Sequence, residues 1–488
     1  MSKSLKILLA ASEGHPFSKT GGLADVMGAL PMALHEKNHD VRVILPKYRC
    51  VTDCKKAIEP IDIEFNIPVG SDSHKSRLAK SYLAEKVPVY LVGNDFFFNR
   101  EGIYGNQGTD YKDNAERFIF FCRAILESCK ALPFYPDIIH LNDWHTGLVP
   151  VYLKSEYAND ENFKSTRTIF SIHNLAYQGN YLADTIKLSG LPDSLFSYDG
   201  LEFYNQFSFM KGGLIYSDLL TTMSPTYSKE IMTPELGCGM EGLLKHRGQD
   251  LSGILNGVDY AEWNPESDSR ITANFSATNL KGKLDCKRDL IQTFSLTVAV
   301  DTPIIGMVTR LSEQKGIDLV MDALEEILNL GAAFVLLGTG SPEHESFFQK
   351  AMEKYAGKCG VRIKFDETLS HKIIAGSDLF MVPSRYEPCG LTQMYALKYG
   401  TIPLVRAVGG LQDTVKEYQA KTNEGSGFKF DQYEKKALIK SMNKALALYQ
   451  TQSAWKNLMK NAMKENFGWP RIADQYLQMY QKALRCEK

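Results

Sequence analysis

Short apolar runs alternate with helix-length segments along the whole chain. The runs cover residues 6–11, 41–45, 87–92, 138–141 and 169–172 in the first half, and 303–308, 333–337, 362–365, 379–382 and 402–405 in the second. Such nearly continuous apolar runs are typical of parallel strands covered on both faces. Between them, segments such as Leu319–Leu330 and Leu391–Tyr399 predict helices, the second ending before Gly400. The pattern therefore predicts an α/β fold with parallel sheets.

The number of strands predicts two domains. About ten strands is the limit for one open twisted sheet, so two doubly wound domains are the more economical arrangement. The polar, Gly- and Pro-containing stretch 256–279 is the predicted boundary, and the segment 432–488 predicts helices only. We expect a Rossmann-like N-terminal domain over 1–255 and a Rossmann-like C-terminal domain over 256–466. Ligands of doubly wound sheets bind beyond the carboxyl ends of the strands, so the loops after the strands are the candidate sites.

Composition narrows the class of protein. The 488 residues contain 56 Lys and Arg against 57 Asp and Glu, and this balance disfavours a binder of nucleic acid or another polyanion. No apolar stretch reaches the roughly 18 residues of a membrane-spanning helix, and the N-terminus lacks a signal-peptide pattern. The nine cysteines contain no C-x-x-C pair, which favours reduced thiols. We expect a soluble, cytoplasmic globular protein.

The loop after the first strand has the pattern of an anion site. Gly21 and Gly22 precede a predicted helix over Leu23–Leu34, and Lys19 lies just before them. Backbone N–H groups at a helix N-terminus bind anions, and a lysine adds a mobile positive charge. A tight strand–helix turn with a solvated lysine fits the same residues. The loop lacks the spacing of a Walker A motif.

Two further loops of the first half carry histidines. His140, Asp143 and His145 could be proposed as metal ligands, but neighbours along a strand point to opposite faces and no matching cluster occurs elsewhere. A polar rim on a sugar-sized pocket, with Trp144 as packing, is favoured. His173 ends the next strand, where it is either structural or a ligand contact.

The loops of the second half indicate a nucleotide-sugar. Arg310 and Lys315 lie five residues apart in one loop, which suits a diphosphate, although a solvated basic loop is the alternative. Glu387 lies just ahead of a helix that begins near Gly390. A carboxylate at this position is explained if it accepts hydrogen bonds from sugar hydroxyls while the amides of Leu391 and Thr392 bind phosphate oxygens.

Together these motifs resemble those of bacterial glycogen synthases and plant starch synthases. The match runs in order from Lys6 to about Leu411, and its most specific pieces are Lys19-Thr20-Gly21-Gly22-Leu23-Ala24-Asp25, His173-Asn174-Leu175-Ala176-Tyr177-Gln178-Gly179 and Glu387-Pro388-Cys389-Gly390-Leu391-Thr392-Gln393. The resemblance implies the GT-B fold, with two Rossmann-like domains facing across a deep cleft and C-terminal helices 467–488 joining the first domain. It also implies transfer of glucose from ADP-glucose to the 4-OH end of an α-1,4-glucan such as glycogen, with retention at the anomeric carbon.

The resemblance also assigns roles to single residues. Glu387, His173, Lys315 and Arg310 are the expected catalytic residues. The expected substrate-binding residues are Lys19, Gly21, Gly22, Asp25, Asp143, His145, Asn256, Phe365, Gly390, Leu391 and Thr392. Phe365 matches an aromatic position that the family uses to stack adenine, where tyrosine is familiar. Many retaining transferases of this fold carry Glu-x7-Glu, and the second position here is Tyr395, a loss that the synthases share. No metal and no other cofactor is expected.

Three alternatives remain at this point. The nearest is a retaining transferase of the same fold that uses UDP-glucose for another acceptor, and a more distant one is an inactive glucan-binding protein. An NAD-dependent oxidoreductase would need G-x-G-x-x-G followed by a ribose-binding acid, and the sequence has neither. No pattern indicates a membrane partner or an oligomeric state.

Overall fold

The computed structural model describes residues 4–106 and 108–485, which divide into two compact units. Among the described residues, the first unit contains 4–106, 108–223, 228–257 and 469–485, and the second contains 224–227 and 258–468. Residues 486–488 of the predicted helical tail lie outside the described part. Each unit is built around one mostly parallel sheet, as the apolar runs predicted.

The first unit has a nine-stranded sheet in the order β14-β13-β9-β8-β1-β2-β5-β4-β3. Its parallel strands are β1 (Lys6–Ala10), β2 (Asp40–Pro46), β5 (Val87–Gly93), β8 (Ile138–Asn142), β9 (Arg167–Ile172), β13 (Leu219–Thr222) and β14 (Leu251–Gly253). Strand β1 is buried after Lys6 and lies between β2 and β8. Strand order reverses at β1, because the strands up to β5 lie on the β2 side of it and the strands from β8 onward lie on its other side. The helix α1 (Gly22–His35) connects β1 to β2.

Two strands at one edge of this sheet escaped prediction. β3 (Glu59–Val69) and β4 (Asp72–Leu83) form an antiparallel hairpin beside β5. In β3 exposed residues alternate with half-buried ones for most of its length, because one face lies toward solvent. A search for continuous apolar runs therefore misses this hairpin, and the sheet is mixed rather than fully parallel.

The second unit has a six-stranded parallel sheet in the order β17-β16-β15-β18-β19-β20. Its strands are β15 (Ile304–Val308), β16 (Ala333–Gly338), β17 (Cys359–Ile363), β18 (Leu379–Val382), β19 (Ile402–Arg406) and β20 (Phe428–Phe430). In chain order this is the 3-2-1-4-5-6 arrangement of a Rossmann fold, with its switch point between β15 and β18. The predicted strands are confirmed, except that β17 begins three residues earlier and ends two residues earlier than the predicted strand 362–365.

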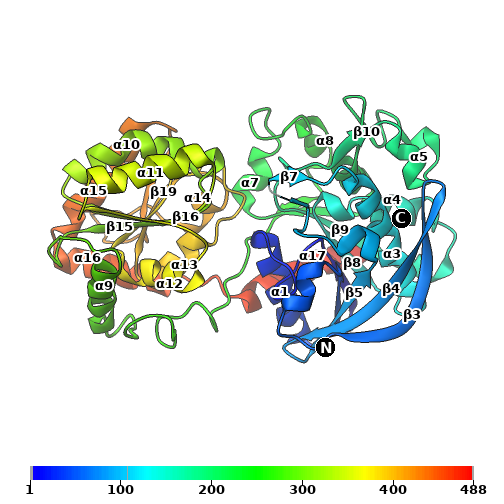
Figure 1. The fold of residues 1–488 in the computed structure, drawn as a ribbon, viewed down its shortest axis with the longest axis horizontal. Helices are drawn as coiled ribbons and strands as arrows, with labels where there is room; N and C mark the ends of the chain where they lie inside the picture. Colours follow the sequence, from blue (N-terminus) through cyan, green and yellow to red (C-terminus); the bar gives the residue numbers. More distant parts are fainter. Residues whose placement is uncertain (1–3, 107, 486–488) are drawn as a thin grey trace. The chain divides into compact units, whose positions relative to one another are not determined.

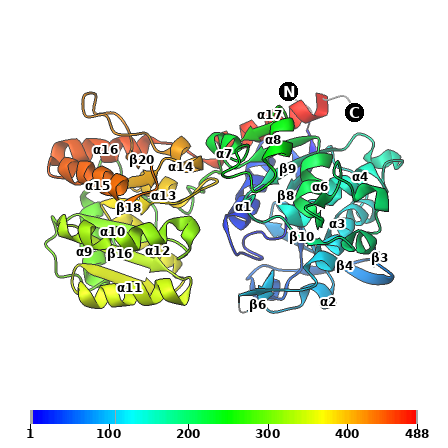
Figure 2. The same cartoon turned by 90° about the horizontal axis from the view of Figure 1, so that it is seen from above.

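Helices cover both faces of this second sheet. One layer contains α10 (Ile317–Asn329), α11 (Pro342–Lys354) and α15 (Lys435–Tyr449), and the other contains α9 (Lys281–Thr293), α12 (Glu367–Gly376), α13 (Thr392–Lys398) and α16 (Gln452–Lys464) (Figure 1). At one edge of the sheet β17 packs against α11, and at the other edge β20 lies beside α15 (Figure 2). No helix of the described chain is both long and apolar enough to cross a membrane.

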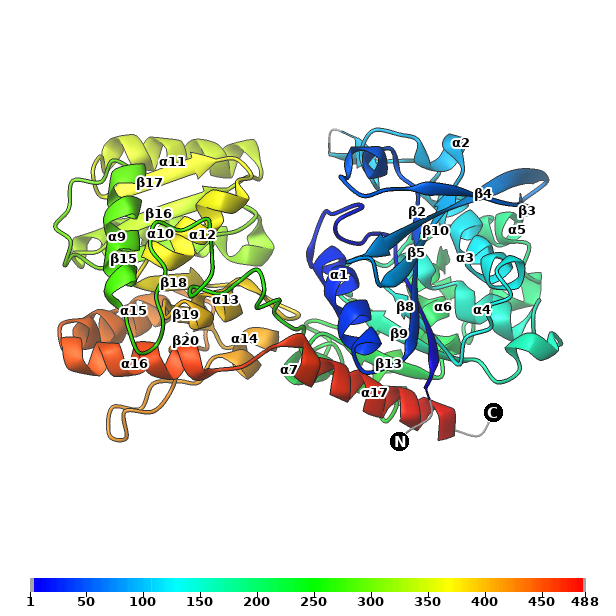
Figure 3. The ribbon, with the colours of Figure 1, turned by 90° about the horizontal axis from the view of Figure 1, so that it is seen from below.

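The last helix belongs to the first unit. α17 (Trp469–Arg485) packs against α1 and β9, and Figure 3 shows it beside α1. Tyr480 of α17 bonds through its hydroxyl to Nδ1 of His140 at 2.8 Å, and Nε2 of that ring bonds to the Ser171 hydroxyl at 2.6 Å. His140 thus has both ring nitrogens occupied in the core and has a structural role.

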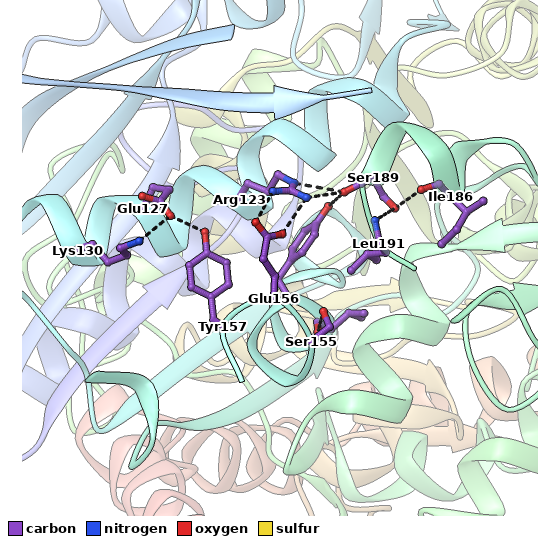
Figure 4. A network of polar contacts seen from close by, with 11 residues as sticks. Arg123, Glu127, Lys130, Ser155, Glu156, Tyr157, Ile186, Ser189 and Leu191 are labelled. Atoms are coloured by element: carbon purple, nitrogen blue, oxygen red, sulfur yellow. Dashed lines mark hydrogen bonds and ion pairs between the residues drawn. The ribbon is translucent and has the colours of Figure 1, made fainter. Parts of the chain in front are cut away.

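A buried arginine ties three helices of the first unit together (Figure 4). Arg123 of α3 (Asn114–Ala131) is only 4% exposed and donates through Nε and Nη2 to the carbonyl of Ser189, which ends α5 (Thr185–Ser189). It also forms an ion pair at 2.9 Å with Glu156, just after α4 (Val149–Lys154). Burying this charge is tolerated because all these contacts satisfy it.

Replacing Arg123 by methionine should lower the free energy of unfolding by about 2 kcal/mol. The change removes charge-assisted hydrogen bonds to Ser189 and Glu156, while the Tyr152 hydroxyl still donates to the Ser189 carbonyl at 2.8 Å. Lys130→Ala is the matched control, because the half-exposed Lys130 pairs with Glu127 at the helix surface and contributes at most about 1 kcal/mol. Urea denaturation of both variants measures the difference, and equal midpoints would contradict the assignment.

Candidate active site

In the first unit, the loops after β1 and β8 meet at the point where strand order reverses. The loop after β1 leads to Gly21, which caps α1, and to Gly22 at its first position. Lys19 lies in the same loop, and its Nζ contacts Asp25 Oδ1 at 2.6 Å, both side chains being about one-third exposed or more. The predicted residues of this loop are therefore brought together beside the N-terminus of a 14-residue helix, where backbone N–H groups lack intrahelical acceptors.

A carboxylate that prediction missed holds this loop in place. Glu13 is 4% exposed, and its side chain accepts hydrogen bonds from the backbone N–H and the hydroxyl of Thr20, the latter at 2.9 Å. Burial raises the pKa of Glu13 to about 7, against the lowering effect of the Thr20 hydrogen bonds, and the negative charge of Asp25 adds to the rise. Thr20 lies between Lys19 and Gly21, so Glu13 fixes the geometry of the candidate anion loop.

Asp143 and His173 meet at the ends of β8 and β9. Asp143 has a φ of +58°, and its Oδ1 accepts the backbone N–H of His173 at 2.7 Å. Burial raises the pKa of Asp143 to about 7, although hydrogen bonds from the His173 and Asn174 backbones lower it, and the nearby Glu13 contributes to the rise. Burial lowers the pKa of His173 to about 3, and its Nε2 bonds to Asn142 Oδ1 at 2.9 Å. At neutral pH His173 is therefore a neutral imidazole.

The structure places two other predicted residues in the interior of the first unit. The His145 ring stacks on Trp144 with centroids 3.9 Å apart and on Tyr104 at 4.7 Å. Its Nδ1 is buried and has no hydrogen-bond partner among the described atoms. Asn256 is buried near the end of the unit, just before the chain passes to the second unit after Gly257.

In the second unit, a buried ion pair joins the two loops at the switch point. Lys315 follows β15 and Glu387 follows β18, and Lys315 Nζ contacts Glu387 Oε2 at 2.6 Å. Glu387 is 5% exposed, and its Oε2 also accepts the Ser384 hydroxyl at 3.0 Å. The two residues are 72 positions apart in the chain and come from the two strands that topology makes neighbours.

Backbone contacts hold the loops after β15 and β18 against each other. Gly316 has a φ of +73°, and a Cβ there would lie 2.1 Å from the carbonyl oxygen of Pro383, so only glycine fits. The backbone N–H of Arg385 donates to the Gln314 carbonyl at 2.9 Å. These contacts on either side of Lys315 hold its side chain at the carboxylate.

The loop that carries Glu387 is held from its other side as well. The Gly410 N–H donates to the Glu387 carbonyl at 3.0 Å, and a Cβ on Gly410 would lie 2.1 Å from the Cys389 carbonyl oxygen. The loop then passes Gly390, at a φ of +72°, to Leu391 and Thr392 at the start of α13. The first turn of a helix presents unpaired N–H groups, as the prediction for Leu391 and Thr392 requires.

Arg310 and Phe365 lie at the same sheet edge but are open to solvent. Arg310 is exposed and lines a hollow of about 720 Å³ between the loops after β15 and β16, together with Ser312, Thr339 and His344. Phe365 lies two residues beyond β17 and is 85% exposed. An exposed aromatic ring at the carboxyl edge of such a sheet can stack on a planar base.

Tyr395 has a packing role in place of a second glutamate. Its ring stacks on Trp263 with centroids 3.9 Å apart and 5° between the planes, and the His371 ring stacks on Trp263 at 3.7 Å. His371 Nδ1 contacts Asp268 at 2.7 Å. Over residues 4–106 and 108–485, no group of three His, Cys, Asp or Glu side chains is arranged to hold a metal ion.

Comparison with known proteins decides the family. The family model described as the starch synthase catalytic domain matches residues 6–246, and that of glycosyl transferases group 1 matches 291–462. "Glycogen synthase 2" of Geobacter sulfurreducens is 45% identical over 98% of this chain and 99% of its own. The chain belongs to the glycogen and starch synthase family. It is thus a retaining glycosyltransferase with the GT-B fold.

Further relatives of this family agree. "Glycogen synthase" of Thermotoga petrophila is 43% identical over 98% of this chain and 99% of its own. The catalytic domain of starch synthase IV from Arabidopsis thaliana, solved with ADP and acarbose, is 34% identical and superposes with a TM-score of 0.92 over 99% of this chain and all of that one. A sucrose-phosphate synthase from Thermosynechococcus elongatus, at 17% identity and a TM-score of 0.61 over 98% of both chains, shares the fold.

Glu13 should contribute stability that is lost as pH rises from about 4.5 to 7, opposite in sign to the contribution of buried histidines such as His173, whose pKa is lowered to about 3. The folded protein keeps protons on Glu13 and Asp143 up to about pH 7, whereas the unfolded chain releases them near the ordinary values of 4.5 and 3.8. At these two carboxyls the unfolded state therefore binds fewer protons in this window, which makes the slope of unfolding free energy against pH more negative. Glu13→Gln removes the contribution of Glu13, so the slope of the variant should be more positive than that of the parent.

Urea denaturation at steps between pH 4.5 and 7.5 measures the slope. Glu161→Gln is the control, because this carboxylate is 79% exposed and pairs with Lys164 at the surface. A Glu13→Gln protein with the slope of the parent would show that Glu13 does not carry the raised pKa.

Proposed function

We propose that the chain transfers glucose from ADP-glucose to the non-reducing 4-OH end of an α-1,4-glucan such as glycogen, with retention at the anomeric carbon. The observation that carries the proposal is the buried Lys315–Glu387 pair at the switch point of the second unit. Relatives that align over almost the whole chain are named glycogen synthases, and the starch synthase IV structure contains ADP and acarbose, which supports an adenine nucleotide and a glucan-like acceptor.

Positive side chains of the second unit suit the leaving group. When the bond between the anomeric carbon and the phosphate oxygen breaks, the departing ADP gains negative charge. Lys315 and Arg310 supply cations for that charge, and the N–H groups at the start of α13 supply hydrogen-bond donors. In this proposal Phe365 stacks on the adenine base. Lys19 and the Gly21-Gly22 turn of the first unit are proposed phosphate contacts as well.

Glu387 is proposed to stabilise positive charge on the sugar ring rather than to bond to it. Retaining glycosidases use a carboxylate as nucleophile. Here, however, Oε2 of Glu387 already accepts hydrogen bonds from Lys315 and Ser384, which lowers its nucleophilicity. We therefore favour attack by the acceptor hydroxyl on the face that ADP leaves. The bond from the acceptor oxygen to the anomeric carbon forms, and the acceptor proton passes to the departing phosphate oxygen.

The first unit is proposed to contact the transferred glucose. Asp143 accepts hydrogen bonds and, at a pKa near 7, carries a partial negative charge under working conditions. His173 is neutral and serves as a hydrogen-bonding group rather than as a cation. Catalysis without a metal or other cofactor stays a prediction, as does cytoplasmic localisation.

ADP-glucose should support glucan synthesis at a much higher kcat/KM than UDP-glucose. The two donors share the glucose and the diphosphate and differ in the base, so the comparison isolates the nucleotide specificity. Incorporation of labelled glucose into glycogen measures both. Faster turnover of UDP-glucose would instead favour the related transferases, and binding of glycogen without turnover of either donor would indicate an inactive glucan-binding protein.

Lys315→Ala should lower kcat by roughly 10²- to 10³-fold, because Lys315 acts on charge that develops only in the transition state. The change also leaves Glu387 buried without its cation, which should destabilise the fold by about 3–5 kcal/mol, so kcat is measured well below the melting temperature. Lys354→Ala is the control, since Lys354 pairs with Glu325 at the surface of the same unit. An unchanged kcat with only a raised KM would exclude this role for Lys315.

A further inference from the structure

Arg385 connects the loop of Glu387 to the helix that follows Lys315. Its Nη2 donates to Asp318 Oδ2 at 2.5 Å, with 46% of the arginine and 39% of the aspartate side chain exposed. Asp318 lies in the first turn of α10, three residues after Lys315. Arg385 lies two residues before Glu387. This ion pair therefore joins the same two loops as the buried pair of Lys315 and Glu387, at a second and more exposed point.

Tyr433 supports both members of this exposed pair. It lies between β20 and α15, so a third loop of the second unit reaches the pair. Its hydroxyl donates to Asp318 Oδ1 at 2.5 Å, and its ring lies 4.3 Å from Cζ of the Arg385 guanidinium. Partial burial alone would raise the pKa of Asp318, but the hydrogen bonds from Tyr433 and Arg385 lower it overall. The carboxylate is therefore charged at neutral pH, with both oxygens occupied.

The backbone of Arg385 is held as well as its side chain. Its N–H donates to the Gln314 carbonyl at 2.9 Å, and its carbonyl accepts a hydrogen bond from Arg406 Nη1 at 2.5 Å. Arg406 ends β19, and its Nε donates to the Asp431 carbonyl, just after β20, at 3.0 Å. Contacts from the ends of β15, β19 and β20 thus converge on one residue of the loop after β18. We name the set Asp318, Arg385, Arg406 and Tyr433 the arginine clamp.

The arginine clamp has a defined geometry although it lies near the surface. An ordinary surface ion pair contributes little to stability, because solvent screens it and two long side chains must be ordered. Asp322 of α10 and Lys435 of α15 form such a pair, 3.3 Å apart and with 62% and 41% of their side chains exposed. In the clamp the planar guanidinium meets a carboxylate at its edge and a tyrosine ring at its face, which fixes its orientation. The network therefore specifies the path of the loop more than it stabilises the whole unit.

Glu387 is sensitive to the path of that loop. Only Tyr386 separates it from Arg385, so a displacement of the Arg385 backbone moves Glu387 as well. The Glu387 carboxylate is 5% exposed and is shared between Lys315 and Ser384, through hydrogen bonds of 2.6 and 3.0 Å. Stabilisation of transition-state charge needs groups placed in advance, and an error of about 1 Å can lower a rate by up to about 10²-fold.

We propose that Arg385, oriented by Asp318 and Tyr433, is a positioning residue that places the Glu387 carboxylate for glucose transfer. Arg385 acts through Glu387 and is not itself a substrate contact. The inference rests on the proposed function, which makes Glu387 the group that stabilises positive charge on the sugar ring. It extends the reacting centre to an exposed network that reaches the last strand of the sheet.

Arg385→Met tests the clamp, because methionine keeps an unbranched apolar stem and removes the guanidinium. Its kcat with ADP-glucose and glycogen should fall roughly tenfold, while both KM values and the melting temperature stay close to those of the parent. Asp318→Asn should lower kcat in the same way, and the double variant should lose no more than the larger single loss, because the two side chains act as one unit. Asp322→Asn, which removes a charge one turn later in α10, is the matched control and should keep the parental kcat.

The same change in a Glu387→Gln background separates positioning from a general structural role. Arg385→Met should alter the residual kcat of that protein by less than about twofold, because the carboxylate that Arg385 places is gone. An equal loss in both backgrounds, a parental kcat for Arg385→Met, or a lower melting temperature with parental kcat would each refute the clamp and leave the proposed function standing. A parent protein that transfers no glucose from ADP-glucose to glycogen would overturn the proposed function and this inference with it.

Discussion

The buried ion pair between Lys315 and Glu387 depends on two loops that leave adjacent strands at the switch point of the second unit. A carboxylate that is 5% exposed needs a cation or several donors, because water no longer solvates it. Two backbone contacts bring Lys315 to this carboxylate. Gly316 lies close to Pro383, and the Arg385 N–H donates to the Gln314 carbonyl. Leu391 and Thr392, the proposed phosphate contacts, follow along the chain, and their position depends on this closure.

In the first unit, carboxylates also follow strands where strand order reverses, but their charges are compensated in a different way. Glu13 and Asp143 also follow strands on either side of a reversal of strand order, and both are held by backbone N–H groups rather than by a lysine or an arginine. Hydrogen bonds from amides compensate burial less fully than an ion pair does, so both carboxyls have a pKa near 7. Such groups change charge near neutral pH, and Glu13 does so while holding the loop of Lys19.

Most of the parallel strands were predictable because burial on both faces leaves a continuous apolar run, but β13, β14 and β20, of three or four residues each, were not predicted. The hairpin of β3 and β4 was not, since its residues alternate between solvent and protein. Lys315 and Glu387 were each identified from loop chemistry, but no local pattern pairs residues 72 positions apart. Glu13 received no role from the sequence, because its partner Thr20 is brought to it only by the folding of the loop. Tyr395 was visible as a departure from Glu-x7-Glu, whereas its stack on Trp263 depends on tertiary packing.

A glycosyltransferase that uses a nucleotide-sugar and a glucan must recognise a charged donor and a neutral acceptor. A diphosphate is recognised by charge, and charge alone does not distinguish one phosphate compound from another. In the proposed function, selectivity for the base therefore depends on the proposed stacking on Phe365. A glucan carries no charge, and its recognition depends on ring faces and hydroxyl groups, each contributing little. A polymer compensates for weak contacts by making several of them at once. The proposed donor site therefore needs only a few cations placed in particular loops, which is compatible with a net charge of −1.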